Sequence, residues 1–510
     1  MRRATRPAFA ALTMATTVTT LAALSACTST DSGSGATGGK KDTLTLGMSA
    51  DIQGWDPSNQ PGYQGWTGEA VYQSLIQCDA LGKPQPDAAE SWTFKKDNTG
   101  VTFQLRSGMK FSDGTPVDSA AVKASIAYIG QHGGQAARFA SMRVDTPDSR
   151  TVVIAVPKPN PTLVGRMCEA KLASPKFLAS GQVNKAPVGS GPYTLDQSAT
   201  TSGSVYTFAK NDAYWNAKAY PYKKLVIKKI TSETAALNAL KTGQLDGSLI
   251  TQATYNEAEA SGLKVVKLRG NTTRLLLTDH QGKKIPALGN VNVRRAMNMV
   301  FDKEAMAKDL YRGLASPAVQ IFRPGSSAYI KDLKDPYPYN VEKAKDLMAK
   351  AGYAKGFTVE IPFMQGQNLE ALIPVVKQQL GLLNITVKQV TLSGPNAISE
   401  LLSGKYPMPL WQLGNYGESL QDIADYVLPD GIWNVMHQPD PTVAKLYDKV
   451  LTSSGQESAA AQQEINRYIS DQAWFVPMAY PDGFYAHSSK IRVPTMSDSS
   501  ALNPLLRDFK

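Results

Sequence analysis

The chain has few of the residues that build metal centres, with only three cysteines and four histidines among 510 residues. The histidines are widely separated and show neither HxxxH nor HxH spacing: His132, His280, His437 and His487. A direct metal site is therefore not expected, and surface or capping positions are predicted for these rings. Cys78 and Cys168 are not spaced as metal ligands. Outside the cytoplasm they could form a disulfide, and the sequence leaves that pairing open.

Several functional classes lack their usual signals. The Gly-x-Ser-x-Gly, His-Glu-x-x-His and P-loop motifs are absent, which argues against a hydrolase or an NTPase. No apolar run in the body of the chain reaches the ~20 residues of a membrane-spanning helix. Basic residues occur in scattered pairs instead of a stripe with interleaved aromatics, so nucleic acid is not an expected partner. The net charge falls from +11 to +8 without the first three arginines and is typical of a basic surface facing an anionic membrane or wall.

The N-terminus carries the clearest signal of location. Three arginines at positions 2, 3 and 6 precede an uncharged, largely apolar run over 7–23, the order of a secretory signal peptide. The following Leu24-Ser25-Ala26-Cys27 resembles the bacterial lipobox, in which the cysteine takes a diacylglycerol and becomes the mature N-terminus. We therefore expect a signal peptide over 1–26 and lipidation of Cys27. The alternatives are a signal peptide cleaved elsewhere and a transmembrane anchor.

Residues 28–41 are rich in Ser, Thr and Gly and contain no aromatic residue. Such a segment cannot bury a core, so residues 27–42 are predicted to be a lipidated cysteine and a flexible tether. The remaining ~470 residues are too many for one hydrophobic core, which favours two or three lobes.

Strand and helix patterns alternate along this body. Strands are predicted over 43–47, 92–94, 101–105, 151–156, 225–230, 357–363 and 385–390. Helices are predicted over 233–242, 293–310 (with Asp302 capping a second segment), 341–351 and 369–382. This order favours an α/β fold with right-handed crossovers and a largely parallel sheet.

Seven short motifs occur in a consistent order. They are Leu75–Asp79 with Pro86–Trp92, Phe103–Pro116, Val188–Tyr193, Asn211–Trp215, Ala236–Asp246, Val293–Ala296 with Phe301–Lys303, and Asn340–Tyr353. Together they resemble the extracytoplasmic solute-binding proteins of ABC importers, the peptide/nickel-type group called family 5. The motifs themselves are mostly turns and helix starts, such as the Asp-Gly turn before Pro116, so they identify a fold and not a cargo.

The resemblance implies a two-lobe fold of the class II periplasmic-binding-protein type that closes over its ligand by a hinge. Lobe I would comprise residues 43–270 and 480–510, with an inserted subdomain at about 65–165. Lobe II would comprise 271–479. The chain would cross between the lobes near 269–271 and 478–480, and the ligand would bind in the cleft between them.

Candidate ligand-binding residues are aromatic and polar groups in loop segments. They are Trp55, Tyr63, Trp66, Trp411, Asn415, Tyr416, Glu418, Trp433 and His437, with Asn434 beside the last pair. In the family the segment after Trp411 often carries an aspartate that pairs with a peptide's α-ammonium group. Here no aspartate follows before Asp422, and Glu418 could take its place. For each aromatic residue, packing within or between lobes is the alternative.

The expected function is that of a lipid-anchored receptor on the outer face of the cell membrane, a monomer without cofactor or catalytic residues. It would deliver a small solute, by family default an oligopeptide or a peptide-like molecule, to an ABC permease. Sugars, opines and chelated metals stay open as cargo. The alternatives are a ligand receptor for a membrane sensor and a lipoprotein hydrolase.

Overall fold

A computed structural model describes residues 42–60, 65–79, 82–133, 136–268, 271–365, 369–394, 396–413, 419–453, 455–495 and 503–510. Asp42–Lys510 forms one compact unit, separate from residues 1–41. Cys27 and the predicted tether lie outside the described residues. In the described part, no helix has both the length and the apolar character needed to cross a membrane.

The first sheet has seven strands, in the order β12-β19-β11-β1-β10-β9-β8. Their bounds are β1 Thr43–Met48, β8 Tyr193–Leu195, β9 Val205–Lys210, β10 Lys224–Lys229, β11 Gly247–Ile250, β12 Lys264–Leu268 and β19 Gly483–His487. Helices α6 (Glu233–Lys241) and α7 (Tyr255–Ala260) pack beside this sheet at β11 and β12. Aromatic side chains dominate its main core, which also takes in helix α1 (Gly65–Val71).

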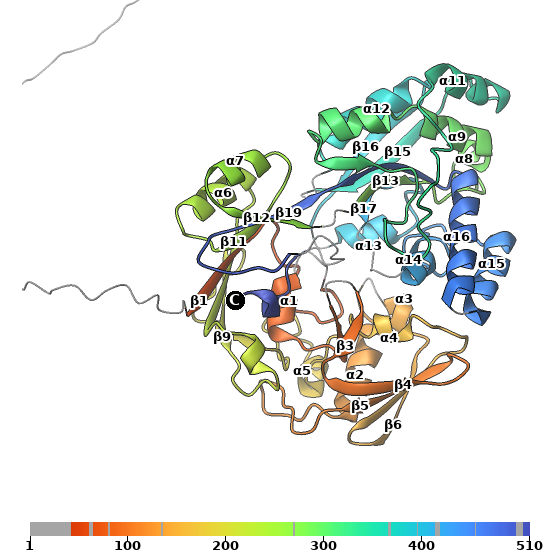
Figure 1. The fold of residues 1–510 in the computed structure, drawn as a ribbon. Helices are drawn as coiled ribbons and strands as arrows, with labels where there is room; N and C mark the ends of the chain where they lie inside the picture. Colours follow the sequence, from red (N-terminus) through yellow and green to blue (C-terminus); the bar gives the residue numbers. More distant parts are fainter. Residues whose placement is uncertain are drawn as a thin grey trace, which may run out of the picture. The chain divides into compact units, whose positions relative to one another are not determined.

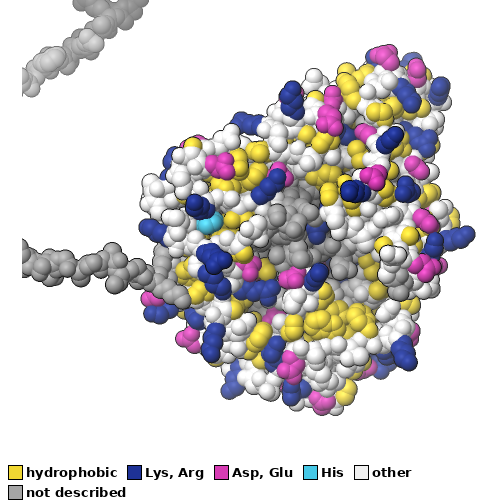
Figure 2. Space-filling view, viewed as in Figure 1, with side chains coloured by type: hydrophobic (Ala, Val, Ile, Leu, Met, Phe, Trp, Pro, Cys, Tyr) yellow, Lys and Arg dark blue, Asp and Glu magenta, His cyan; other side chains and the backbone are white. Residues whose placement is uncertain are grey.

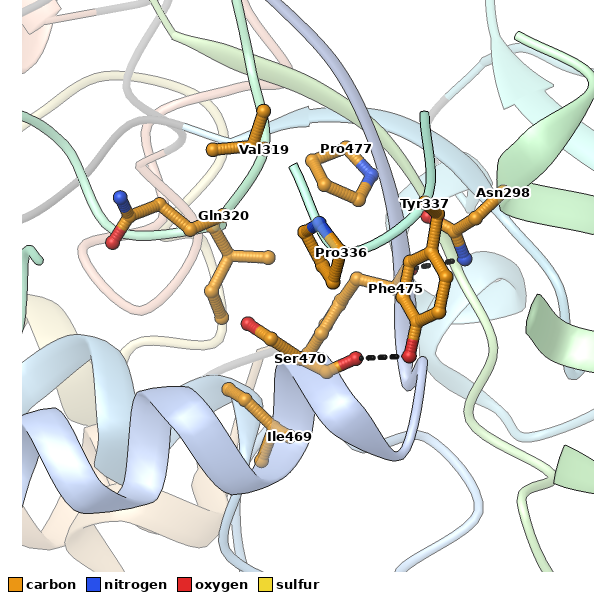
Figure 3. Close-up of a pocket in the computed structure, with 10 residues that line it drawn as sticks. Asn298, Val319, Gln320, Pro336, Tyr337, Ile469, Ser470, Phe475 and Pro477 are labelled. Atoms are coloured by element: carbon orange, nitrogen blue, oxygen red, sulfur yellow. Dashed lines mark hydrogen bonds between the residues drawn. The ribbon is translucent and has the colours of Figure 1, made fainter. Parts of the chain in front are cut away.

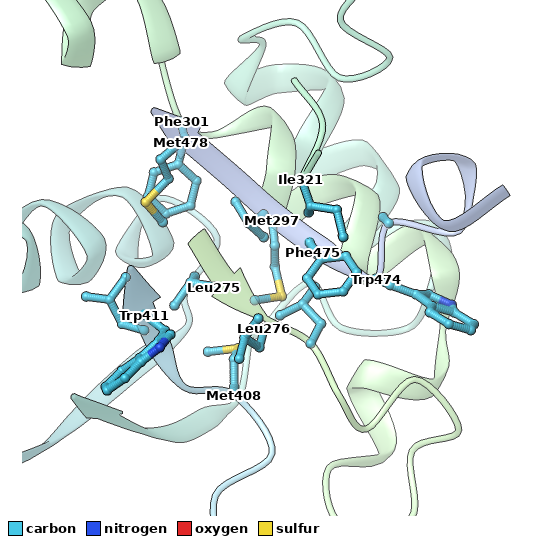
Figure 4. Packing of buried hydrophobic residues seen from close by; sticks show 14 of the residues in the cluster. Leu275, Leu276, Met297, Phe301, Ile321, Met408, Trp411, Trp474, Phe475 and Met478 are labelled. Atoms are coloured by element: carbon cyan, nitrogen blue, oxygen red, sulfur yellow. The ribbon is translucent and has the colours of Figure 1, made fainter. Parts of the chain in front are cut away.

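The second sheet has four strands, in the order β14-β18-β13-β17. Their bounds are β13 Thr272–Leu276, β14 Ala315–Pro317, β17 Leu410–Leu413 and β18 Phe475–Pro481, and β15 Thr358–Met364 pairs separately with β16 Thr386–Leu392. The surrounding helices are α8 Pro286–Gly289, α9 Val291–Met299, α10 Lys303–Ala305, α11 Val341–Lys350, α12 Leu372–Gly381, α13 Ala397–Leu402, α14 Ser419–Tyr426, α15 Pro441–Thr452 and α16 Gly455–Asp471. Figure 4 shows the core of this body, where Leu276, Met297 and Phe475 meet around β13 and β18.

The expectation of a largely parallel sheet is wrong. Among the described strands, parallel pairing is confined to β1 with β10, β1 with β11, and β15 with β16. The second sheet is antiparallel throughout. The alternation of strands and helices along the chain did not reveal the antiparallel pairing for two reasons. Consecutive strands such as β8 and β9 pair directly as antiparallel neighbours, and β18 pairs with β13 although about 200 residues separate them in the sequence.

A third body has its own four-stranded antiparallel sheet, in the order β4-β5-β7-β6. Its elements are β4 Ala89–Phe94, β5 Gly100–Leu105, β6 Arg143–Asp148 and β7 Thr151–Ala155, with helices α2 Ser119–Ile129, α3 Ala136–Phe139, α4 Leu163–Arg166 and α5 Pro175–Ala179. Its apolar core spans Leu75 to Leu172. Cys78, in the short β2–β3 ribbon (Ile76–Cys78 and Pro84–Pro86), is joined to Cys168 by a disulfide with 5.6 Å between Cα atoms.

Several predicted helices begin at the side chain that the sequence suggests. The Asp302 carboxylate accepts the backbone N–H of Ala305 at 2.9 Å and starts α10, and Asn340 accepts that of Lys343 at 2.9 Å and starts α11. Gly352 follows α11 with φ of 82°, a conformation that favours glycine as the helix terminator. Local polar contacts therefore set these boundaries.

The chain passes between the first and second sheets twice. It leaves β12 of the first sheet, enters β13 of the second, and returns from β18 to β19 around Asp482. Because β12 pairs with β19 and β13 pairs with β18, the two connections join neighbouring strands at both ends (Figure 1). The chain therefore links the two sheets at two neighbouring positions.

Candidate functional site

Two of the predicted site residues meet in the body of the second sheet. The rings of Trp411, on β17, and Trp433, in the loop after α14, lie 5.2 Å apart between centroids, and both side chains are about 8% exposed. The backbone N–H of Trp433 donates to the carbonyl of Asp425 at 2.9 Å. The Trp433 indole Nε1 is buried and finds no hydrogen-bond acceptor among the described residues. A buried donor without an acceptor is free to bind a polar group of a ligand.

A buried arginine lies beside this pair. Arg274 faces Trp411 across the β13–β17 ladder and is fully buried. Its Nη1 donates to the carbonyl of Ile321 at 3.3 Å, and its guanidinium lies 4.7 Å from the ring centre of Tyr426. Burial lowers the pKa of Arg274, while the negative charge of Asp422 opposes that shift. The Arg274 side chain therefore connects strand β13 with helix α14. In the sequence, this helix directly follows the predicted site residues Asn415, Tyr416 and Glu418.

Helix α14 also carries an acid that contacts the third body. Asp425 Oδ2 lies 2.7 Å from Arg138 Nη2, on α3, and accepts the side-chain amide of Gln421 at 2.8 Å. Asp425 Oδ1 lies 3.7 Å from Arg166 Nη2, on α4. Burial raises the pKa of Asp425, and the positive charges of Arg138 and Arg166 oppose that rise. The ionised form of this buried carboxylate therefore depends on the two arginines.

Trp55 and Trp66 lie in the aromatic core of the first sheet, apart from Trp411 and Trp433. The Trp55 ring makes edge contacts with Tyr206 and Phe208, at 5.9 and 6.2 Å between centroids. The Trp66 Nε1 donates to the carbonyl of Pro504 at 2.7 Å. These contacts explain the burial of both rings by packing alone.

The remaining sequence candidates are distributed as follows. Tyr63, Asn415, Tyr416 and Glu418 lie outside the described residues. His437 is exposed, has φ of 49°, and its Nδ1 lies 2.8 Å from the carbonyl oxygen of Pro429. The structure therefore brings together Trp411 and Trp433 and separates them from Trp55 and Trp66.

The expectation that all four histidines are surface or capping residues is wrong for His487, which is 5% exposed and lies on β19. It fills a position of the first sheet, where Tyr485 stacks on it at 6.4 Å between centroids. His280 is partly buried and stacks on Trp474 at 4.1 Å. Within the described ranges, no three His, Cys, Asp or Glu side chains gather as a metal site would require.

One small cavity lies between α16 and β18. Figure 3 shows Tyr337 beside it, with its hydroxyl donating to the carbonyl of Ser470 at 2.8 Å, and Asn298 donating to the carbonyl of Phe475 at 3.0 Å. Its volume is about 10 Å³, room for about one water molecule. This cavity belongs to the packing of α16 and is too small for a solute.

Sequence reasoning missed three charged residues at this site: Arg274, Arg138 and Asp425. Arg274 had a usable signal, because it is the only charged residue in the strand 272–277, which is otherwise Thr and Leu. A charge inside a buried strand is rare and marks a specific partner. Arg138 and Asp425 had no such signal, because these two paired residues are 287 positions apart in the sequence.

The chain was compared with known proteins. Residues 83–430 match the model for bacterial extracellular solute-binding proteins, family 5. The protein belongs to this family. Family 5 members are solute-binding proteins, and the resemblance drawn from the seven motifs is thereby confirmed. The two-lobe α/β fold is confirmed as well.

Individual family 5 relatives differ in what they bind. The glutathione-binding protein GsiB of Escherichia coli K12 is 26% identical over 346 residues, which cover 65% of this chain and 66% of GsiB, just under two thirds. Among solved structures, the PBP AgaA in complex with agropinic acid, from A. tumefacien R10, has a TM-score of 0.83 at 23% identity, covering 92% of this chain and 98% of AgaA. DppA from Helicobacter pylori in complex with the peptide STSA has a TM-score of 0.79 at 22% identity, covering 92% and 97%.

Proposed function

We propose that this family 5 protein captures a small peptide or peptide-like solute between two lobes and delivers it to an ABC permease. The observation that carries the proposal is the pair of adjacent connections between the first and second sheets, because bodies joined in this way can close around a ligand. Closure would give a permease a surface that differs between the loaded and the empty receptor.

The change of sheet along the chain supports the lobe boundaries that we propose. Lobe I comprises residues 43–270 and 480–510, with the third body as the subdomain inserted near 65–165, and lobe II comprises 271–479. The four-stranded sheet β4-β5-β7-β6 and its separate core support the inserted subdomain. The extension of β18 to Pro481 supports a second connection at Asp482, slightly later than the expected 478–480.

The ligand contacts proposed here centre on the segment around β17 and α14. Trp411 and Trp433 provide an aromatic surface, and the Trp433 Nε1 provides a hydrogen-bond donor. Asn415, Tyr416 and Glu418 stand between β17 and α14 in the sequence, and Glu418 is the proposed partner of a ligand ammonium group. His437 and Tyr63 are secondary candidates, whereas the burial of Trp55 and Trp66 in the core of the first sheet favours the packing alternative for these two rings.

The known ligands of the relatives indicate a chemical class. GsiB is named for glutathione, DppA was solved with a tetrapeptide and AgaA with agropinic acid. We infer that the solute of this chain is likewise a small peptide-like or amino-acid-derived molecule. The protein is proposed to perform no covalent chemistry and to act as a monomer held at the outer face of the membrane through a lipid on Cys27.

Native mass spectrometry of the full chain, purified from its own host, tests the proposal directly. We expect a discrete added mass, or a ladder of peptide masses, that is released on denaturation. Glutathione, the peptide STSA, agropinic acid and a nickel–histidine chelate are then titrated calorimetrically. No bound mass and no heat with any of them would contradict the proposed solute class. Conversion of the bound molecule to a product would establish an enzyme instead.

A further inference from the structure

A buried ion pair connects two hydrophobic cores of the protein, those of the third body and of lobe II. Arg138, on α3, precedes Phe139 in the core of the inserted body, whereas Asp425, on α14, lies between Ile423 and Tyr426 of the lobe II core. Their side chains are 3% and 1% exposed, with Nη2 and Oδ2 2.7 Å apart. Figure 1 shows α14 facing α3 to the right of the strands where the chain crosses between lobes.

Each partner also has a contact inside its own body. Arg138 Nη1 lies 2.6 Å from Glu169 Oε2, just after α4. Asp425 Oδ2 accepts the side-chain N–H of Gln421, one turn earlier on α14, at 2.8 Å. Each charged group would therefore keep a polar partner if the two bodies separated.

This arrangement makes the contact reversible. A buried ion pair normally resists separation, because removing one partner leaves the other as an uncompensated buried charge. Here separation would admit water to both groups and leave Glu169 with Arg138 and Gln421 with Asp425. The ion pair between Arg138 and Asp425 would then stabilise the protein only while the two bodies are in contact.

We propose that Arg138 and Asp425 form a closure latch, an ion pair made when the lobes close and broken when they open, after which Arg138 keeps its contact with Glu169 and Asp425 keeps its contact with Gln421. The latch rests on the proposed function, since it presumes that closure is the output of binding. Arg166, at 3.7 Å from Asp425, adds a second cation from the same body and strengthens the closed arrangement.

The latch is tested by the distance between the lobes in the absence of ligand. Spin labels are placed at exposed Lys96, in the inserted body, and exposed Lys350, at the end of α11, in the full chain purified in detergent with Cys27→Ser. Double electron–electron resonance then reports the ratio of short to long distances. Asp425→Asn, which keeps the shape and can retain the Gln421 contact, is expected to lower that ratio at least tenfold.

Glu169→Gln is the matched control, because it removes one negative charge from the same cluster on the other side of the contact. It eliminates the competing partner of Arg138, so the ratio should stay equal or rise. The double variant Arg138→Gln/Glu169→Gln should open like Asp425→Asn and serves as the test if Asp425→Asn does not fold.

Three outcomes decide the proposal. Opening by Asp425→Asn but not by Glu169→Gln supports the latch. An unchanged ratio in Asp425→Asn, or equal opening by both single variants, overturns it and leaves a purely structural ion pair. Opening by Asp425→Asn with no closure of the wild type by glutathione, STSA, agropinic acid or a nickel–histidine chelate would instead contradict the proposed solute class while the latch stands.

Discussion

Two tryptophan indoles of this protein are buried to a similar extent but differ in hydrogen bonding. The Trp66 Nε1 donates to Pro504, whereas the Trp433 Nε1 has no acceptor among the described residues. Leaving a buried donor unsatisfied costs about 1–3 kcal/mol. Under the proposed function, a ligand acceptor would offset this cost at Trp433, whereas at Trp66 the protein itself supplies the acceptor.

With the ligand contact proposed above, Trp433→Phe should weaken ligand binding about tenfold or more, because it removes the donor that the ligand would satisfy. Trp66→Phe is the control. It should lower the free energy of unfolding by about 1 kcal/mol, because the Pro504 carbonyl loses its donor, and leave affinity unchanged. Calorimetric affinity and urea unfolding measure the two effects. Equal affinity of wild type and Trp433→Phe would remove Trp433 from the site.

Glu69, on α1, gives the fold a pH dependence. Burial raises its pKa from 4.5 to about 7, against the opposing effects of the Leu506 N–H at 2.9 Å and of Lys171. The folded state therefore binds more protons than the unfolded state between these two pH values. The free energy of unfolding should fall as pH rises from 4.5 to 7, by roughly 2 kcal/mol after allowing for solvent screening.

Glu69→Gln should abolish this loss, because the amide oxygen can still accept the Leu506 N–H without carrying a charge. The variant should match wild type near pH 4.5 and have a higher Tm at pH 8. Thermal unfolding at several pH values measures the difference, and Glu457→Gln, an exposed acid in the first turn of α16, reports the effect of losing one charge. A difference that does not grow with pH would contradict the raised pKa of Glu69.

At the scale of elements, a disulfide links the β2–β3 ribbon of the third body to the segment after α4. The bond joins residues 90 positions apart in the sequence, so it restricts the unfolded chain strongly. Cys78→Ser/Cys168→Ser should lower the free energy of unfolding by about 4.6 kcal/mol, the cost that the chain-entropy relation gives for a loop of this length.

Urea unfolding with and without dithiothreitol measures the effect of the disulfide. Reduction should destabilise wild type and leave the double serine variant unchanged. Reduction that left wild type unaltered would show that the two thiols are not paired in the protein.

The sequence predicted elements best where their signals are local. The strand over 151–156 is found as β7 and the helix starting after Asn340 as α11, since β-branched residues and a capping side chain act within a few residues. The long helix expected over 293–310 is instead α9, α10 and a π-helical turn over Met306–Leu310. The apolar residues keep a helical spacing across these changes of helix type, so periodicity alone does not detect them.

The site was less predictable because its residues meet through tertiary contacts. Trp411 and Trp433 could be selected as aromatic residues in loops, but their pairing depends on how β17 and α14 pack. Nothing in the local sequence connects Arg138 with Asp425. Strand pairing had the same limit, since the neighbour of β13 on either side comes from more than 100 residues away.

At the scale of the whole molecule, the hydrophobic residues form separate core clusters, and the Arg138–Asp425 pair is a buried contact between two of them. The two sheets share adjacent connections, and the latch lies away from those connections. The face in Figure 2 carries Lys and Arg side chains interspersed with Asp and Glu, without a continuous basic stripe. On that face the net positive charge is therefore spread out, which suits weak attraction to an anionic surface better than binding of a polyanion.

Membrane attachment should be independent of ligand binding, because Asp42–Lys510 forms a compact unit to which residues 1–41 do not belong. Cys27→Ala should abolish partition of the full chain into the detergent phase of Triton X-114, or block its maturation, and should leave ligand affinity within about twofold of wild type. Removal of the proposed lipidation site would eliminate the lipid, whose buried methylenes would each contribute about 0.8 kcal/mol to anchoring. Loss of affinity with membrane partition unchanged would show that Cys27 is not the lipid site and that the N-terminal segment takes part in binding.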